Sequence, residues 1–450
     1  MFPNPQDSLP LQKMPHVDAF QKHAQGLLRA AKIGEAAVAD WSRDWIWTLV
    51  ETANARSQSV RTRKQRWIQQ FANYATAELH DKPTLAHAQR VIARSLGFAT
   101  WRTLTAHLQK VSKPASSVAQ FEAAVDAIVG GNLASLKQIL ARNPNLVHAR
   151  SDREHHATLL HYVAANGVEG YRQRTPRNIV KIAGLLLDHG AEIDATCEVY
   201  GGQCTTMGLA ATSVHPANAG VMNDLLQLLL DYGAAVGRKG SAGNNHSLVF
   251  ACLANGRLES ARFLAAKGAH LDIISAAALD DLARVKENFH PDGSRKSKLS
   301  RKRMHEAFRY ACGYGANRVV EFLIERGADL TEHSGDGQTG IHYTVIFGRL
   351  DTLKLLLKFK PPLELQNMYG GTILGQTLWS AAHGGDPQTY SRIIETLIAA
   401  GAHVPERHVP VNPQIDALLI RHGSRPEPKW WWYGEEISSS PASRKNSLKR

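Results

Sequence analysis

Apolar residues recur at three- and four-residue spacing along most of this chain, with polar residues between them. Residues 179–190 (IVKIAGLLLDHG) show the pattern in full. This period is that of an amphipathic helix with one buried face. Gly167 suits the left-handed residue that ends a helix, and Gly131 with Asn132 separates two apolar runs. The pattern therefore predicts an all-α chain made of short helix pairs joined by tight turns.

Two phrases recur in register along the chain. TLLHYVAANG at residues 158–167 returns as TGIHYTVIFG at residues 339–348, and each copy precedes an amphipathic helix and a turn. Such repetition means that the chain is built from stacked copies of one unit. The phrases resemble ankyrin repeats, and this resemblance implies about eight helix-turn-helix units stacked into a solenoid. A closing phrase, Gly-Ala-x-apolar, appears at residues 190–193, 233–236, 268–271, 327–330 and 401–404.

The repeat phrase contains a Thr-x-x-His pair, which is Thr158 with His161 in one copy and Thr339 with His342 in the other. Threonine is a favoured helix N-cap because its hydroxyl accepts a hydrogen bond from a free backbone N–H. In ankyrin repeats the equivalent threonine and histidine hydrogen-bond each other. The resemblance therefore implies a structural role for both histidines. The connection between the two helices of the unit that begins at Thr158 spans residues 170–178 and is longer than a standard repeat allows. We expect this insertion to form a contact loop.

Residues 84–108 carry a second resemblance. They are similar to the motif A-Q-x-x-x-A-R-x-x-G-F-x-S-W-x-x-L, which precedes ankyrin repeats in many bacterial proteins, with Thr100 in the serine position. That module has no assigned chemistry, so the resemblance implies a bacterial protein with an N-terminal helical module. The matching residues are Ala88, Gln89, Ala93, Arg94, Gly97, Phe98, Trp101 and Leu104.

The pattern divides the chain into six parts. We expect a disordered N-terminus, a small helical module, a linker, the repeat array, a capping helix, and an aromatic and basic tail that is mostly disordered. In the tail, Trp430 to Tyr433 form either a strap folded back on the last repeat or a peptide that a partner recognises. The expected N-terminus spans residues 1–17, the helical module 18–111 and the linker 112–120. The repeat array spans residues 121–404, the capping helix 405–425 and the tail 426–450.

Composition narrows the class of protein. With 450 residues, the chain exceeds the usual size of one compact core, which agrees with a repeat array. Its 43% hydrophobic and 21% charged residues are typical of a folded soluble protein. Four scattered cysteines favour a reducing compartment over a disulfide framework. There is no secretory signal and no 18-residue apolar stretch. We therefore expect a cytoplasmic protein without a membrane span.

Motifs for catalysis and metal binding are missing from the sequence. The patterns GxSxG, GxxxxGKS, HExxH and CxxC do not occur. Cys197 and Cys204, taken with His155 and His156, have a spacing that fits no common metal site. The sequence therefore predicts no catalytic residue, no metal site and no cofactor. An enzyme with its chemistry in the N-terminal helices is the least favoured alternative.

The resemblance to ankyrin repeats implies a non-catalytic scaffold or adaptor, expected to be monomeric, that binds a protein partner on the concave face of the array. Ile346 and Phe347 take positions that normally face solvent, and apolar side chains exposed there predict a docking patch. The predicted protein-contact residues are Glu154, His155, Ala165, Asn166, Thr212, Ser213, Tyr314, Asp336, Gln338, Ile346, Phe347, Met368 and Tyr369.

The net charge of +13 and the pI near 9.6 favour an acidic partner, which could be nucleic acid, anionic lipid or an acidic protein surface. The alternative function is therefore a nucleic-acid or ribosome-associated protein that uses basic clusters. Nucleic acid is not favoured, because a flexible basic loop lacks stacking aromatic residues and a rigid platform. One cluster, Arg61, Arg63, Lys64 and Arg66 beside Trp67, also fits the solvated face of a helix with a buried tryptophan. The candidate anion-binding residues Arg295, Lys296, Lys298, Arg301, Lys302 and Arg303 also fit a solvated linker.

Overall fold

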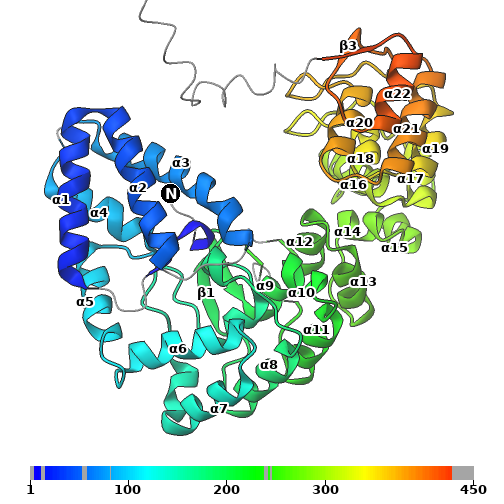
Figure 1. Cartoon of the computed structure of the whole chain (residues 1–450). Coiled ribbons are helices and arrows are strands. Elements are labelled where there is room, and N and C mark those ends of the chain that lie inside the picture. The colour runs from blue at the N-terminus through cyan, green and yellow to red at the C-terminus, as the bar shows by residue number, and fades with distance from the viewer. Residues whose placement is uncertain are drawn as a thin grey trace, which may run out of the picture. The chain divides into compact units, whose positions relative to one another are not determined.

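A computed structural model describes most of the chain. The described residues fall into two compact units, Met1–His270 and Leu271–Arg450, and the helices of each appear in Figure 1. Side chains at positions 5, 52 and 58–63 are not described, and neither is the segment from Trp430 to Tyr433. The described ranges are residues 5–11, 16–52, 58–81, 83–237, 242–243 and 246–427.

The first unit begins with a small helical module of five helices that share one apolar core. Thr100 caps the last of them, since its Oγ1 accepts a hydrogen bond from the backbone N of Thr103 at 3.1 Å. Trp67 is buried in this core. This burial agrees with the interpretation that its basic neighbours form the solvated face of a helix. The helices are α1 (Val17–Ile33), α2 (Glu35–Thr52), α3 (Gln58–Leu79), α4 (Leu85–Ser95) and α5 (Trp101–Val111).

A short segment ahead of the module packs into the same core. It contains the 3₁₀ helix η1 (Pro5–Asp7), and Leu9 is only 1% exposed. The backbone N of Leu9 donates to the carbonyl of Ser95 at 2.8 Å. The expectation of disorder up to residue 17 therefore does not hold for residues 5–11, because a buried leucine and a backbone hydrogen bond hold them.

The remainder of the first unit is built from short helix pairs. The first helix of the second pair is a 3₁₀ helix and not an α-helix, and Ala165 ends it in the left-handed region at φ 50°. These elements are α6 (Ser117–Val129), α7 (Leu133–Arg142), η2 (Pro144–His148), η3 (Leu159–Ala164), η4 (Gly170–Arg172), α8 (Ile179–Asp188), α9 (Thr206–Thr212), α10 (Val214–Asn218), α11 (Met222–Asp231), α12 (Leu248–Ala254) and α13 (Leu258–Ala266).

A β-hairpin interrupts the helices of the first unit. Strands β1 (Thr196–Val199) and β2 (Gly202–Thr205) pair antiparallel, which places Cys197 opposite Cys204. Tyr200 and Gly201 form its two-residue turn, both with positive φ, as a tight hairpin of this kind requires. The helical period does not extend through this insertion, and the prediction of helices alone missed it.

The second unit stacks four helix pairs in chain order. Helix α14 packs on α16, α16 on α18 and α18 on α20, so these four form one row, and the second helix of each pair packs on its own partner. Helix α22 packs against α21, and β3 pairs parallel with β4. The elements are α14 (Ile273–Ala278), α15 (Leu282–Lys286), α16 (Arg301–Tyr314), α17 (Asn317–Glu325), α18 (Gly340–Ile346), α19 (Leu350–Leu357), α20 (Ile373–Ala382), α21 (Pro387–Ala399), β3 (Arg407–His408), α22 (Pro413–Arg421) and β4 (Arg425–Pro426).

The Thr-x-x-His pairs hold helix starts in both units. Thr158 Oγ1 lies 2.8 Å from His161 Nδ1, and Thr339 Oγ1 lies 2.9 Å from His342 Nδ1. In each pair the threonine backbone N also donates to the ring nitrogen. Burial lowers the pKa of His161 to about 4 and lowers the pKa of His342 in the same direction. The two histidines are therefore neutral parts of the framework, and the predicted structural role is confirmed.

Candidate protein-interaction surface

Aromatic side chains occupy corresponding positions in the row of helices of the second unit. Each of α16, α18 and α20 carries two of them four residues apart, so that both lie on one side of their helix. The second ring of α18 and of α20 belongs to the residue that caps the helix. We call this set the aromatic stripe. Its members are Tyr310, Tyr314, Tyr343, Phe347, Trp379 and His383.

The rings of α16 and α18 contact each other across the two repeats. The centroids of Tyr310 and Tyr343 are 5.8 Å apart, and those of Tyr314 and Phe347 are 5.2 Å apart. Aromatic pairs are favourable at such separations. Gly313 gives the rings room, since a Cβ there would lie 3.1 Å from the Phe347 ring. The two helices thus share a continuous row of rings, in which Tyr314 is buried and the other three are partly exposed, and a larger residue at position 313 would disturb it.

Trp379 and His383 continue the stripe on α20. Their rings stack with centroids 4.1 Å apart and planes 17° from parallel. Trp379 is 58% exposed, and His383 is exposed as well. A tryptophan with most of its surface in water is rarely needed for packing and is common in binding surfaces.

A cavity of about 470 Å³ lies between this stacked pair and α18, and we call it the aromatic cavity. Ile346 and Phe347 line it from α18, Trp379 from α20, and Tyr390 from α21. The hydroxyl of Tyr390 lies 2.8 Å from the carbonyl of Ile346, which fixes the wall. Its volume is within the range of sites that take a large side chain or small ligand.

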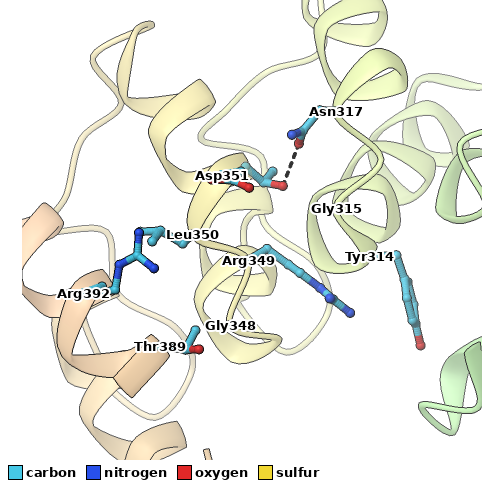
Figure 2. A pocket seen from close by; sticks show the side chains of 10 residues that line it. Tyr314, Gly315, Asn317, Gly348, Arg349, Leu350, Asp351, Thr389 and Arg392 are labelled. Carbon is cyan, nitrogen blue, oxygen red and sulfur yellow. Dashed lines mark hydrogen bonds between the residues drawn. The ribbon is translucent and has the colours of Figure 1, made fainter. Parts of the chain in front are cut away.

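A second cavity of about 450 Å³ adjoins the first, since both include Gly348 and Thr389. We call it the arginine cavity, because Arg349 and Arg392 line it (Figure 2). Arg349 Nε donates to the carbonyl of Gly313 at 2.9 Å. Over the described part of the chain, neither guanidinium forms an ion pair. Arg392 is exposed, and in Figure 2 it extends from α21 towards Leu350. The cavity therefore carries two arginines and one carboxylate, Asp351, and so a net positive charge, beside an aromatic wall.

The turn between α19 and α20 presents two more large side chains. Met368 is 63% exposed and Tyr369 is 79% exposed. The turn is rigid, because the side-chain oxygen of the buried Asn367 accepts hydrogen bonds from the backbone of Tyr369 and Gly371, each at 3.0 Å. The backbone N of Met368 also donates to the carbonyl of Asp336 in the preceding turn at 3.3 Å.

Part of the second unit matches a known protein family. Residues 308–357 match the model described as ankyrin repeats (many copies). This range includes the second half of α16 and all of α17, α18 and α19, and so four of the six rings of the stripe. Over these residues the chain is similar to ankyrin repeats. Among solved structures, it is similar to the human ASB11 ankyrin repeat domain at 18% sequence identity, over 62% of this chain and 98% of that chain, with a TM-score of 0.33. A TM-score this low supports no inference for the present chain.

The predicted fold class, an all-α ankyrin-repeat solenoid with a small helical domain in front, is confirmed by the helix pairs and by the family match. The small hairpin and the β3–β4 pair are the only strands in the described residues. No helix in the described ranges combines the length and the apolar character needed to cross a membrane.

The predicted protein-contact residues fall into three groups according to the solvent exposure of their side chains. Three, all in the second unit, are exposed: Asp336, Met368 and Tyr369. Five are partly buried, namely Glu154, Asn166, Thr212, Ile346 and Phe347. The remaining five are buried, and their assignment to an open contact surface is wrong: His155, Ala165, Ser213, Tyr314 and Gln338.

Of the six predicted contact residues in the first unit, three are buried and three are partly buried, because the unit packs on itself. Asn166 donates to Thr212 Oγ1 at 3.1 Å and accepts a hydrogen bond from the hydroxyl of Tyr200 in the hairpin turn. Glu154 pairs with Arg94 of the helical module at 3.5 Å. Sequence reasoning also missed Tyr310, Tyr343, Trp379 and His383. The signal was present, since aromatic residues recur four apart in three successive repeats.

The first unit buries a group of charged residues that the sequence did not predict. Arg153 is 1% exposed, and its guanidinium lies 2.8 Å from Glu169 and 2.7 Å from Glu122. Arg172 lies 2.7 Å from the other oxygen of Glu122. Burial disfavours the charged form of Glu122, but the two arginines outweigh it and lower its pKa to about 2. The insertion at residues 170–178, expected as a contact loop, therefore supplies a buried ion pair.

This ionic cluster joins the helical module to the first repeats. The backbone N of Glu154 donates to the carbonyl of Gly97 at 2.9 Å. The guanidinium of Arg153 lies 5.5 Å from the centre of the Phe98 ring. His107 Nδ1 and Asp152 Oδ2 are 3.1 Å apart. The Gly-Phe pair of the module motif is therefore part of the contact between module and array.

The basic run of the second unit differs from the predicted loop. Arg301, Lys302 and Arg303 form the first turn of α16, which Ser300 caps, so only the first three cations lie in the loop. All six are exposed, yet the three arginines already have partners in the protein. Arg303 lies 3.0 Å from Asp272, Arg301 lies 3.5 Å from Asp329, and Arg295 donates to the carbonyl of Leu299 at 2.8 Å.

The other basic cluster and the cysteine–histidine group also have structural partners. Arg66 lies 3.6 Å from Asp7, while the side chains of Arg61 and Arg63 are outside the described residues. Cys197 and Cys204 are buried free thiols, and burial raises the pKa of Cys204 to about 12. No group of three or more metal-ligating side chains occurs in the part of the chain that the structure describes.

Proposed function

We propose that the protein is a non-catalytic scaffold whose second unit binds a polypeptide partner along the aromatic stripe, on the concave face of the ankyrin array. Ankyrin repeats generally mediate contacts between proteins, and residues 308–357 match that family. The observation that carries the proposal is Trp379, exposed in line with the rings of two preceding repeats. Composition favours a cytoplasmic protein, and the motif at residues 84–108 favours a bacterial one. We include both features, and a monomeric state, in the proposal.

The chemistry of the surface favours a protein partner. Tryptophan, tyrosine and arginine are the residues most enriched where binding energy concentrates in protein interfaces. The stripe, Tyr369 and Arg392 supply all three within one unit. A nucleic-acid site would need cations free to meet phosphates, whereas the arginines of the basic run at residues 295–303 are paired with the protein's own acceptors.

Site-specific photocrosslinking tests this proposal. A benzophenone amino acid is placed at Trp379 or Tyr369 in the full-length chain and, as a control, at the exposed Glu321 of α17. Irradiation in cells that express the protein naturally should give the same discrete adduct from the first two positions and none from the control. Equal adducts at Glu321 would place the partner elsewhere, and so would the absence of adducts at Trp379 and Tyr369 both in the full-length chain and in a chain that ends at Glu427.

A further inference from the structure

The aromatic cavity and the arginine cavity define the chemistry of an occupant. One wall is formed by Phe347, Trp379 and Tyr390, and the adjoining wall carries Arg349 and Arg392. An occupant that fits both has large aromatic side chains followed or preceded by acidic ones. Since both cavities include Gly348 and Thr389, the aromatic and acidic groups should be only a few residues apart.

This chain itself contains such a segment just after its last described residue. Residues 428–437 read PKWWWYGEEI, which is four consecutive aromatic residues, one glycine and then Glu435 and Glu436. The order of aromatic and acidic residues along the segment also agrees with the order of the two cavities along the array. A chain that returns from the end of the array meets the aromatic cavity, on α20 and α21, before the arginine cavity, which extends back to α16.

The segment is long enough to reach both cavities. The backbone N of Glu427 donates to the carbonyl of His408 at 2.8 Å, so the described chain ends beside the strand that follows α21. The cavities lie at the opposite end of α21, where Thr389, Tyr390 and Arg392 line them. Helix α21 has 13 residues and is therefore about 20 Å long. Residues 428–436 span up to about 30 Å when extended.

We infer that residues 428–437 are an internal ligand of the second unit, with one ring of the run Trp430 to Tyr433 in the aromatic cavity, its neighbours against the aromatic stripe, and Glu435 and Glu436 at Arg349 and Arg392. The segment then competes with the partner for the aromatic stripe, a consequence that rests on the proposed function. A short tether gives an effective concentration of about 1 mM. If the separate peptide binds with a Kd of about 10 to 100 μM, the tethered segment weakens a competing partner by about 10- to 100-fold.

Peptide binding tests the inference without the partner. The probe is a fluorescent synthetic peptide of sequence PKWWWYGEEI, and the proteins are the full-length chain and a chain that ends at Glu427. Anisotropy should show binding to the shortened chain and at least about tenfold weaker binding to the full-length chain, whose cavities are occupied. A full-length chain with Trp430, Trp431, Trp432 and Tyr433 all changed to serine should bind the probe like the shortened chain.

Charge reversal tests the acidic contact. In the shortened chain, Arg392→Glu should weaken the probe at least about tenfold, and a probe with both glutamates changed to lysine should recover most of the loss. The matched control is Lys354→Glu, an exposed lysine on α19, which should leave the Kd within about twofold.

Three results would overturn the inference. They are no binding of the probe to the shortened chain, equal binding to the shortened and full-length chains, and equal effects of Arg392→Glu and Lys354→Glu. Dimers of the full-length chain that disappear on shortening would assign the segment to a second copy. The proposed function has a separate readout, since crosslinks at Trp379 in the shortened chain would support it even if the probe fails to bind.

Discussion

At the scale of single residues, Arg153 is where the buried charges of the first unit converge. Its guanidinium contacts Glu122 and Glu169, and neither carboxylate has enough access to water to replace it. Arg153→Ala would leave the fully buried Glu169 with Arg172, 3.5 Å away, as its remaining guanidinium, and removing one partner of a buried ion pair typically costs about 3 to 5 kcal/mol. Urea unfolding should show this loss. Arg43→Ala, which removes an exposed pair with Asp40, should cost less than about 1 kcal/mol, and similar losses in both variants would contradict the prediction.

Glu122 predicts a dependence of stability on pH. Its pKa in the folded state is about 2, below the ordinary value of 4.5. The carboxylate therefore contributes stability that is present above about pH 4.5 and is lost as the pH falls towards 2, a contribution on the order of 3 kcal/mol. Unfolding free energies measured between pH 6 and pH 3 should fall more steeply for the wild type than for Glu122→Gln. Parallel curves would show that other groups dominate the acid response.

At the scale of elements, the repeat register has a direct test. Leu186 on α8 and Leu356 on α19 are buried as predicted. Each leucine-to-alanine change should therefore cost about 2 to 5 kcal/mol in denaturant unfolding. Thr158→Ala should cost about 1 kcal/mol through loss of the cap. Lys181→Ala, on the exposed side of α8, is the control and should have almost no effect.

The packing of the aromatic stripe determines which substitutions should weaken partner binding without lowering the free energy of unfolding. Phe347 was predicted to face solvent, but its ring packs on Tyr314 and beside Gly313, so Phe347→Ser should lower stability as well as binding. The changes that isolate binding are Trp379→Ser and Tyr369→Ser. Together they should reduce crosslinking or capture of the partner and change the free energy of unfolding by less than about 1 kcal/mol. A larger loss would mean that these side chains support the fold.

At the scale of the whole molecule, the net charge of +13 raises the question of nucleic acid. We expect that the full-length protein retains no RNA or DNA at physiological salt, and that neutralising all six cations at residues 295–303 changes nothing. Filter binding over a salt series checks this. A steep decrease of log K with log salt that flattens in the six-fold variant would instead support the alternative function.

The sequence alone determined the helical class, the repeat register and the Thr-x-x-His caps. These features depend on contacts between residues a few positions apart, which apolar spacing and cap residues report directly. The exposed positions in the turns, such as Met368 and Tyr369, also followed from the register. The β1–β2 hairpin did not, because the strands form in an insertion that departs from the repeat.

Only the tertiary structure decided which residues form the surface and which are buried. Tyr310 and Tyr343 are 33 positions apart, and their rings meet because the repeats stack at that spacing. Arg153 reaches Glu122, 31 positions away, because the helical module and the insertion enclose it. Whether a charge or a ring lies in water or in the core depends on such long-range packing, and local sequence pattern carries no record of it.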